Sequence, residues 1–282
     1  MKVFENHVAV VTGAASGIGR ALAERFAAAK MRIVLADIEQ AALEETLRAM
    51  REAGATVAPF VGDVSHASEV ERLADLAYSE FGAVHILCNN AGVAGGGGAA
   101  WEQSLETWQW ILGVNLWGVI HGIHAFVPRM LASGEEGHVV NTASAAGLRT
   151  GPFLSPYYAS KHAVVALSES LHFDLQLAGA KVHTSVLCPA FVKTRIAESG
   201  RNQSTAAAPG QFPEGMRQRV EAGTPPELIA ERVWEAVRDN QFWILTHPEF
   251  EYLIRDRVEG MLQRRNPVPH VFTVPQNTNN PE

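Results

Sequence analysis

Three side chains that could handle a proton, Ser144, Tyr157 and Lys161, lie close together in the sequence. Tyr157 and Lys161 are four residues apart, so on a helix the phenol and the ammonium share one face. A nearby ammonium favours the ionised form of a phenol, whose reference pKa is about 10. Ser144 follows an apolar run, and its hydroxyl can hold a carbonyl oxygen against the phenol. This chemistry moves a proton to or from an alcohol oxygen, and it needs a hydride partner elsewhere in the chain.

A glycine-rich turn after the first apolar run could bind that partner. The segment TGAASGIG contains Gly13, Ser16, Gly17, Ile18 and Gly19. Glycines let the backbone approach a pyrophosphate, and the N-terminus of the following helix favours its negative charge. The spacing G-x-x-x-G-x-G differs from the usual dinucleotide pattern, and the residues after Gly19 exclude the G-K-[ST] of a phosphate-binding P-loop. The turn alone is therefore a modest signal of a dinucleotide site.

Asp37 ends the second apolar run, eighteen residues after Gly19. A carboxylate at this position can accept both hydroxyls of an adenosine ribose, and it repels a 2′-phosphate. No Arg or Lys follows it directly, and Ser16 rather than a basic residue precedes Gly17. The sequence therefore predicts NAD in preference to NADP. Taken alone, Asp37 could also be a surface residue at a strand end, and the glycine turn weakens that alternative.

The chain alternates short apolar runs with stretches of helical periodicity, which predicts an α/β fold. Helices between strands impose right-handed crossovers, and nearly continuous apolar strands fit a sheet covered on both faces. We therefore predict a doubly wound, mainly parallel seven-stranded sheet with helices on both faces. The expected strands are residues 7–13, 32–37, 56–63, 84–92, 137–144, 181–189 and 242–247. The expected helices are residues 19–30, 39–53, 66–81, 104–132, 157–178 and 227–239.

A single domain is predicted over residues 1–265, with a substrate lid at about 190–226. Residues 199–226 are rich in Gly, Pro, Ser and Ala and interrupt the alternation. A break of that length inside a compact domain is usually a functional lid or a disordered segment. Residues 266–282 are expected to form a Pro- and Asn-rich C-terminal tail.

The composition of the 282-residue chain limits its partners and its location. It is 47% hydrophobic and 19% charged, as ordinary globular proteins are. A net charge of −7 without a basic block disfavours a nucleic-acid or anionic-membrane partner. We find no secretory signal and no run of about 18 apolar residues, and Cys88 and Cys188 lie in apolar runs, as reduced buried thiols would. We therefore expect a cytoplasmic protein.

In their order and spacing, these motifs resemble the short-chain dehydrogenase/reductase family over roughly residues 1–195. The match comprises the TGAASGIG turn, Asp63 and Val64, Asn89 to Gly92, Asn115, Ser144, Tyr157 and Lys161. The resemblance implies a Rossmann-like fold, with Tyr157 as the general acid/base and Ser144 orienting the substrate oxygen. It also implies that Lys161 bonds the nicotinamide ribose and lowers the pKa of the phenol, and that Asn115 anchors a water relay.

The same resemblance implies a set of cofactor contacts and an assembly. Ala190 departs from the family pattern, which often has glycine after the proline, and it adds a methyl group where the backbone approaches the nicotinamide. Residues 104–132 and 157–178 resemble the helices at the family's subunit interfaces, so we expect a homodimer or homotetramer. The expected contacts to NAD are Gly13, Ser16, Gly17, Ile18, Gly19, Asp37, Ile38, Asp63, Val64, Asn90, Ala91, Gly92, Tyr157, Lys161, Pro189, Val192 and Thr194.

Aromatic residues that flank the catalytic segment indicate an apolar or aromatic small-molecule substrate, such as a secondary alcohol or ketone. We predict a substrate pocket formed by Ser144, Phe153, Tyr157, Phe191 and Phe212. The stretch TRIAESGRN is similar to the start of the lid in bacterial dehydrogenases that oxidise benzylic alcohols of lignin-type aryl ethers.

Other functions fit these residues less well. NADP-dependent ketoreduction is the main rival among enzymes. A non-catalytic nucleotide sensor is the rival outside them, but a sensor would not require the whole catalytic set. His121 and His124 are three apart, yet no H-E-x-x-H motif or third ligand is near, so we predict no metal. Ser144 does not lie in a G-x-S-x-G turn, which disfavours a hydrolase.

Overall fold

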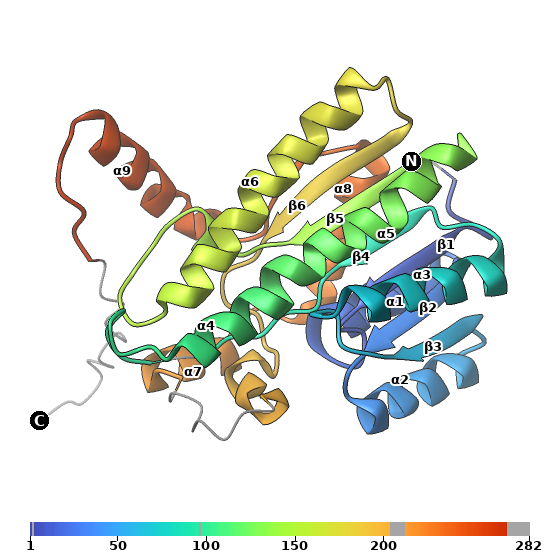
Figure 1. Ribbon diagram of the computed structural model, residues 1–282, viewed down its shortest axis with the longest axis horizontal. Helices are drawn as coiled ribbons and strands as arrows, with labels where there is room; N and C mark the ends of the chain where they lie inside the picture. Colours follow the sequence, from blue (N-terminus) through green and yellow to red (C-terminus); the bar gives the residue numbers. More distant parts are fainter. Residues whose placement is uncertain (2, 96, 204–211, 270–282) are drawn as a thin grey trace, which may run out of the picture.

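A seven-stranded, all-parallel sheet forms the centre of the molecule (Figure 1). The computed structural model describes residues 1, 3–95, 97–203 and 212–269 of the chain. The strand order is β3-β2-β1-β4-β5-β6-β7, which confirms the predicted doubly wound fold. The strands are β1 (Val8–Thr12), β2 (Arg32–Asp37), β3 (Val57–Val61), β4 (Ile86–Asn89), β5 (Gly137–Thr142), β6 (Val182–Cys188) and β7 (Trp243–Leu245).

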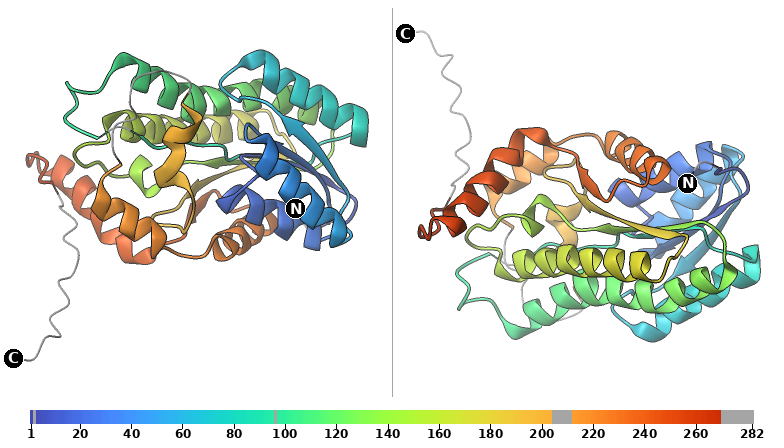
Figure 2. Two further views of the ribbon diagram at one scale, coloured as in Figure 1. Left: turned by 90° about the horizontal axis from the view of Figure 1, so that it is seen from below. Right: turned by 90° about the horizontal axis from the view of Figure 1, so that it is seen from above.

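Helices cover both faces of this sheet (Figure 2). On one face lie α1 (Gly17–Ala28), α2 (Gln40–Glu52) and α8 (Pro226–Asp239). On the other lie α3 (Ala67–Phe81), α5 (Gly118–Ser133) and α6 (Ser155–Leu177), with α4 (Leu105–Leu112) leading into α5. Two helices that the sequence did not predict are α7 (Glu214–Glu221) and α9 (Glu251–Leu262). Short segments of other helix types are η1 (Gly113–Trp117), η2 (Ala145–Gly147), η3 (Ile196–Asn202) and η4 (Pro248–Phe250).

Side chains of each central strand alternate between two hydrophobic cores. In β1, Ala9 and Val11 pack into the core beneath α1 and α8, whereas Val8 and Val10 pack beneath α3 and α5. All four are fully buried, which explains why the strand is apolar throughout. Burying a valine side chain contributes roughly 1.5–3 kcal/mol, so both faces of the sheet stabilise the fold.

The chain reverses its direction of travel across the sheet between β1 and β4. It runs outward from β1 through β2 to β3 and then returns to place β4 on the other side of β1. Open parallel sheets bind ligands at such a switch point, beyond the carboxyl ends of the strands. The segments that follow β1, β2, β4, β5 and β6 all begin at this edge.

Helices α4 and α5 run together through the π-helical turn η1 as one helical stretch, Leu105–Ser133. By length and mean hydropathy this stretch could cross a membrane, although polar residues interrupt it and it contains no continuous apolar run of 18 residues. The stretch is apolar because it packs against α3, α6 and the sheet, and 44% of its most apolar 18 residues are buried in the protein. A core helix passes the same test of length and hydropathy.

Residues 190–226, the predicted lid, contain η3 and α7 beside the carboxyl edge of the sheet. Residues 204–211 of this segment lie outside the described part of the chain, as do residues 270–282 of the predicted tail. Residues 266–269 have no regular secondary structure.

Candidate active site

A cleft of about 630 Å³ opens at the carboxyl edge of the sheet, at the switch point between β1 and β4. Every residue that the sequence predicted to contact the cofactor lines it. Ser144 lines it as well, and so do several residues that the sequence did not indicate, among them Glu39, Arg195 and Arg201. The structure therefore brings the cofactor half and the proton-handling half of the prediction into one cavity.

The turn after β1 is held open by backbone geometry that only glycine tolerates well. Gly13 and Gly17 have φ angles of +67° and +54°, in the left-handed region. A side chain on Gly19 would collide with the carbonyl of Gly13 and with the amide of Asn90. Asn90 braces the same turn, because its Nδ2 donates to the Thr12 carbonyl at 3.0 Å. The start of α1 is thus accessible to a phosphate group, which fits a dinucleotide.

Asp37, at the end of β2, is fixed by two backbone amides. Its Oδ2 accepts from Ala15 N and its Oδ1 from Glu39 N, each at 2.9 Å. Burial raises the pKa of the Asp37 carboxyl, and the two backbone hydrogen bonds counteract part of that rise. The carboxylate is therefore rigidly placed in the wall of the cleft, as a ribose-binding group must be.

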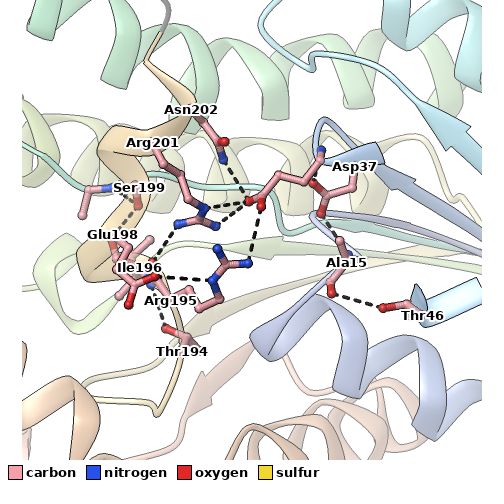
Figure 3. A network of polar contacts seen from close by, with 12 residues as sticks. Ala15, Asp37, Thr46, Thr194, Arg195, Ile196, Glu198, Ser199, Arg201 and Asn202 are labelled. Carbon is pink, nitrogen blue, oxygen red and sulfur yellow. Dashed lines mark hydrogen bonds and ion pairs between the residues drawn. The ribbon is translucent and has the colours of Figure 1, made fainter. Parts of the chain in front are cut away.

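An ionic cluster joins the loop after β2 to η3 across the cleft (Figure 3). The Glu39 carboxylate accepts hydrogen bonds from Arg195 Nη1, Arg201 Nε and Asn202 Nδ2 at 3.4, 3.1 and 3.1 Å. The hydrogen bonds from Arg201 are the main cause that lowers the pKa of Glu39. The sequence could not reveal this cluster, because its members are far apart in the chain.

Tyr157 and Lys161 lie one turn apart on α6, as predicted. The Lys161 ammonium is 5.8 Å from the centre of the Tyr157 ring and donates to the Thr142 carbonyl at 2.9 Å. Ser144 follows β5 at the start of η2, where its Oγ accepts from Ala146 N at 3.1 Å and donates to the Pro189 carbonyl at 3.2 Å. These contacts anchor the serine and the lysine to the ends of β5 and β6.

Burial controls the acid–base properties of this group. It raises the pKa of the Tyr157 phenol, and a hydrogen bond with Ser144 offsets only part of the rise. It also lowers the pKa of Lys161 to about 8. Burial therefore sets the direction in which the pKa of Tyr157 shifts, and the predicted lowering of this pKa by Lys161 stays a prediction.

Asn115 sits behind the cleft and does not line it. It lies in the π-helical turn η1, fully buried, and its Oδ1 accepts from Val93 N at 2.8 Å. Its Nδ2 donates to the Val93 carbonyl and to Ser160 Oγ at 2.9 and 3.1 Å. Asn115 thus ties the segment after β4 to α6, next to Tyr157 and Lys161. Its implied role in a water relay stays a prediction.

A smaller cavity of about 90 Å³, here called the side pocket, adjoins the cleft. Three of the residues predicted for the substrate pocket besides Ser144 line it, namely Tyr157, Phe191 and Phe212. Phe153 does not line either cavity. It is 53% exposed with a φ of +72°, so its loop turns it toward solvent. The full lining is Ala94, Ser144, Ala145, Ala146, Arg149, Leu154, Tyr157, Tyr158, Ala190, Phe191, Ile196, Phe212, Met216, Val220 and Phe250.

His121 and His124, the two histidines considered as metal ligands, make different contacts. His121 Nδ1 contacts the Val64 carbonyl at 2.9 Å, whereas His124 is exposed and lies 3.8 Å from Glu71. Within the described residues, no group of three or more His, Cys, Asp or Glu side chains could hold a metal ion.

Comparison with known proteins identifies the family. The sequence model described as "short chain dehydrogenase" matches residues 7–205. The chain belongs to the short-chain dehydrogenase family. A crystal structure of a short-chain dehydrogenase/reductase from Burkholderia phymatum in complex with NAD superposes with a TM-score of 0.93 at 43% identity, covering 97% of this chain and 100% of that one.

Two curated members of the short-chain dehydrogenase family match nearly as much of the chain. A 1-deoxy-11-beta-hydroxypentalenate dehydrogenase from Streptomyces exfoliatus is 38% identical over 91% of this chain and 89% of its own length. A C alpha-dehydrogenase from Sphingobium sp. is 34% identical over 93% of this chain and 86% of its own. Such relatives support an oxidoreductase that acts on CH–OH groups with a nicotinamide cofactor.

Proposed function

We propose that this short-chain dehydrogenase interconverts a secondary alcohol and its ketone with NAD, on an apolar or aromatic substrate. The observation that carries the proposal is that Ser144 and Tyr157 line both cavities. A substrate oxygen held by these two hydroxyls would have its carbinol carbon facing the cleft. The side pocket, largely apolar, would hold the rest of the molecule.

Tyr157, Ser144 and Lys161 together would move the hydroxyl proton of the alcohol. Tyr157 accepts the hydroxyl proton during oxidation, and Ser144 holds the substrate oxygen in place as the carbonyl forms. Lys161 holds positive charge near the phenol, which favours the phenolate that forms when a proton leaves toward solvent. A bound nicotinamide cofactor would accept or supply the hydride. The glycine turn, Asp37, and the residues after β3, β4 and β6 would hold that cofactor across the cleft.

NAD is favoured over NADP by two carboxylates at one end of the cleft. Asp37 is braced there by backbone amides, and Glu39 neutralises Arg195 and Arg201. The complex of the Burkholderia phymatum relative with NAD supports this choice. The name of the C alpha-dehydrogenase relative fits a benzylic alcohol as one substrate class. The buried free thiols Cys88 and Cys188 fit the cytoplasm, which we propose as the location.

Turnover of a panel of secondary alcohols tests the proposal. Purified protein is mixed with NAD or NADP and with 1-phenylethanol, 2-octanol or cyclohexanol, and the absorbance of the reduced nicotinamide is followed. We expect oxidation with NAD, and a loss of roughly 10²–10⁴-fold in kcat for Tyr157→Phe. Asp37→Ala should relax the preference for NAD. A higher kcat/KM with NADP would favour the ketoreductase rival, and binding of NAD without any turnover would favour a sensor.

A further inference from the structure

Helix α9 lies at one end of the molecule, beyond the layers that cover the sheet (Figure 1 and Figure 2). Its main contact is with η4, the short segment that precedes it. Of its twelve residues, Leu253 is the one that is buried. A helix of this length is marginal in water by itself, and most of the stability of such helices comes from packing of an apolar face. A contact with another surface would therefore stabilise α9.

The exposed side of α9 carries an apolar stripe. Its members are Ile254, Val258, Met261 and Leu262, whose spacing of four, three and one residues places them on one side of the helix. Val258, Met261 and Leu262 are 41%, 56% and 78% exposed. Ile254 is partly buried. An apolar stripe of this kind normally packs against a neighbouring element, and here most of it faces solvent.

Two opposite charges lie along one edge of the apolar stripe. Arg255 and Glu259 are both exposed, and they are four residues apart, so they follow each other on the same side of the helix. Within the described part of the chain, the ion pair on α9 joins Asp256 to Arg265 at 3.3 Å and uses neither of these two charges. The edge therefore presents a cation and an anion to any surface that covers the stripe.

We infer that α9 binds the α9 of a second copy of this chain, in antiparallel orientation, about a two-fold axis near Val258. Ile254 of each copy then lies opposite Leu262 of the other, because both are four residues from Val258. A two-fold contact joins the same patch of both copies, so the charged edges of the two helices also meet. Arg255 of each copy is thus close to Glu259 of the other. This charge complementarity favours a second copy as the partner.

The α9 contact is separate from the interface expected at residues 104–132 and 157–178, which lie in α4, α5 and α6. Two different two-fold contacts on one chain can close into a tetramer. We expect a tetramer if both contacts form, and a dimer if α9 alone associates. In either case, loss of the α9 contact halves the mass of the assembly.

Sedimentation of charge-reversed variants tests the inference. Arg255→Glu alone, or Glu259→Arg alone, places two like-charged pairs in the contact. The dissociation constant should rise about tenfold or more, and the mass of the assembly should halve at micromolar concentration. An equimolar mixture of the two variants pairs opposite charges between copies again, although the charges within each helix stay as they were. The mixture should therefore regain the wild-type mass.

Helix α2 supplies a matched control. Arg48 and Glu52 are also exposed and four residues apart, and α2 covers a different part of the molecule. Arg48→Glu and Glu52→Arg should each keep the wild-type mass. The α9 variants should unfold at the wild-type melting temperature when all are compared at concentrations that dissociate the contact.

A disulfide tests the position of the two-fold axis. In Val258→Cys the introduced thiols of two copies lie near the axis, so mild oxidation should join them into a covalent dimer on a non-reducing gel. Ala49→Cys, on the exposed side of α2, should stay a single chain. The natural thiols Cys88 and Cys188 are buried, which keeps the background low.

The inference is overturned if both charge-reversed variants keep the wild-type mass, or if their mixture stays dissociated. In the first case, flotation of the wild type with phosphatidylserine vesicles would assign the stripe to a lipid surface. An increase in the binding of a hydrophobic dye on deletion of residues 270–282 would instead assign the stripe to the chain's own C-terminal residues.

Discussion

Lys161 places a cation in a position that is almost closed to water, since only 3% of the residue is exposed. Its ammonium is kept there by the Thr142 carbonyl and by the proximity of Tyr157. Desolvation lowers its pKa to about 8, which means that the folded protein holds this charge at a cost. Active sites commonly contain such groups, which serve the reaction while they lower the stability of the fold.

Lys161→Met should therefore stabilise the protein at neutral pH while it removes activity. The folded-state pKa of about 8 lies below the ordinary 10.5, so the unfolded chain binds more protons between these values. Stability of the wild type is thus reduced below pH 8 and recovers as the pH rises toward 10.5. The full difference corresponds to about 3 kcal/mol, and we expect the variant to be about 1–3 kcal/mol more stable at pH 7.

Urea denaturation from pH 7 to 10 measures this effect. The free energies of unfolding of the wild type and Lys161→Met should converge as the pH rises. Lys181→Met, on an exposed residue, should give a profile parallel to that of the wild type. A constant difference between the wild type and Lys161→Met across this range would contradict the role of desolvation.

Glu39→Gln should shift the cofactor preference toward NADP. The Glu39 carboxylate neutralises Arg195 and Arg201, and all three line the cleft near Asp37. Without it, two guanidiniums are available to a 2′-phosphate, so the ratio of kcat/KM for NADP to that for NAD should rise about tenfold. Glu52→Gln, at the exposed end of α2, is the matched control. An unchanged ratio in Glu39→Gln would mean that this cluster is remote from the adenosine ribose.

Among the elements of the fold, the segment after β7 holds the loop that follows β6 through hydrogen bonds of His247. His247, just after β7, is buried, and its Nδ1 accepts from Ala190 N at 3.2 Å. Its Nε2 then carries the proton and can donate to the Phe191 carbonyl at 3.2 Å, and it also meets Thr224 Oγ1 at 3.0 Å. Residues on three segments are thus tied to one imidazole, beside the position where Ala190 departs from the family pattern.

His247→Leu should loosen this loop and weaken cofactor binding. We expect the dissociation constant for NAD to rise about tenfold, because the Ala190 amide and the Phe191 carbonyl lose a buried partner. His247→Asn, which keeps a donor and an acceptor, should restore part of the affinity, as measured by fluorescence titration. His124→Leu on the exposed face of α5 is the control. If His247→Leu lowered the melting temperature but left NAD affinity unchanged, the imidazole would be structural only.

The same elements explain how far the sequence could predict the site. All seven strands and the cofactor cleft were predicted, because buried parallel strands and glycine turns leave local signals. Phe153 was misplaced because its direction depends on a positive φ in a loop, which the sequence does not reveal. Arg149 was missed although it follows Ser144 by five residues, because only the packing of α7 and η4 makes that loop a pocket wall. The raised pKa of Tyr157 likewise depends on burial.

For the whole molecule, the helical face formed by α4, α5 and α6 leaves large apolar side chains in contact with solvent. Trp117, Phe173 and Leu177 are 52%, 58% and 88% exposed. Large exposed apolar side chains are often buried in an interaction surface when they lie together. The same helices resemble those at the family's subunit interfaces, so a second copy of this chain is the partner that we expect to cover them.

A charged substitution on this face should shift the protein toward the monomer. We expect the wild type to sediment as a dimer or tetramer at micromolar concentration without detergent. In the double variant Trp117→Glu/Phe173→Glu, the dissociation constant of the assembly should rise at least about a hundredfold, because the new charges would be buried in the interface. Trp101→Glu changes a side chain that is 87% exposed before α4 and should leave the assembly intact. A wild-type monomer that needs detergent to stay in solution would instead mean that lipid, and not a second copy, covers the Leu105–Ser133 helix.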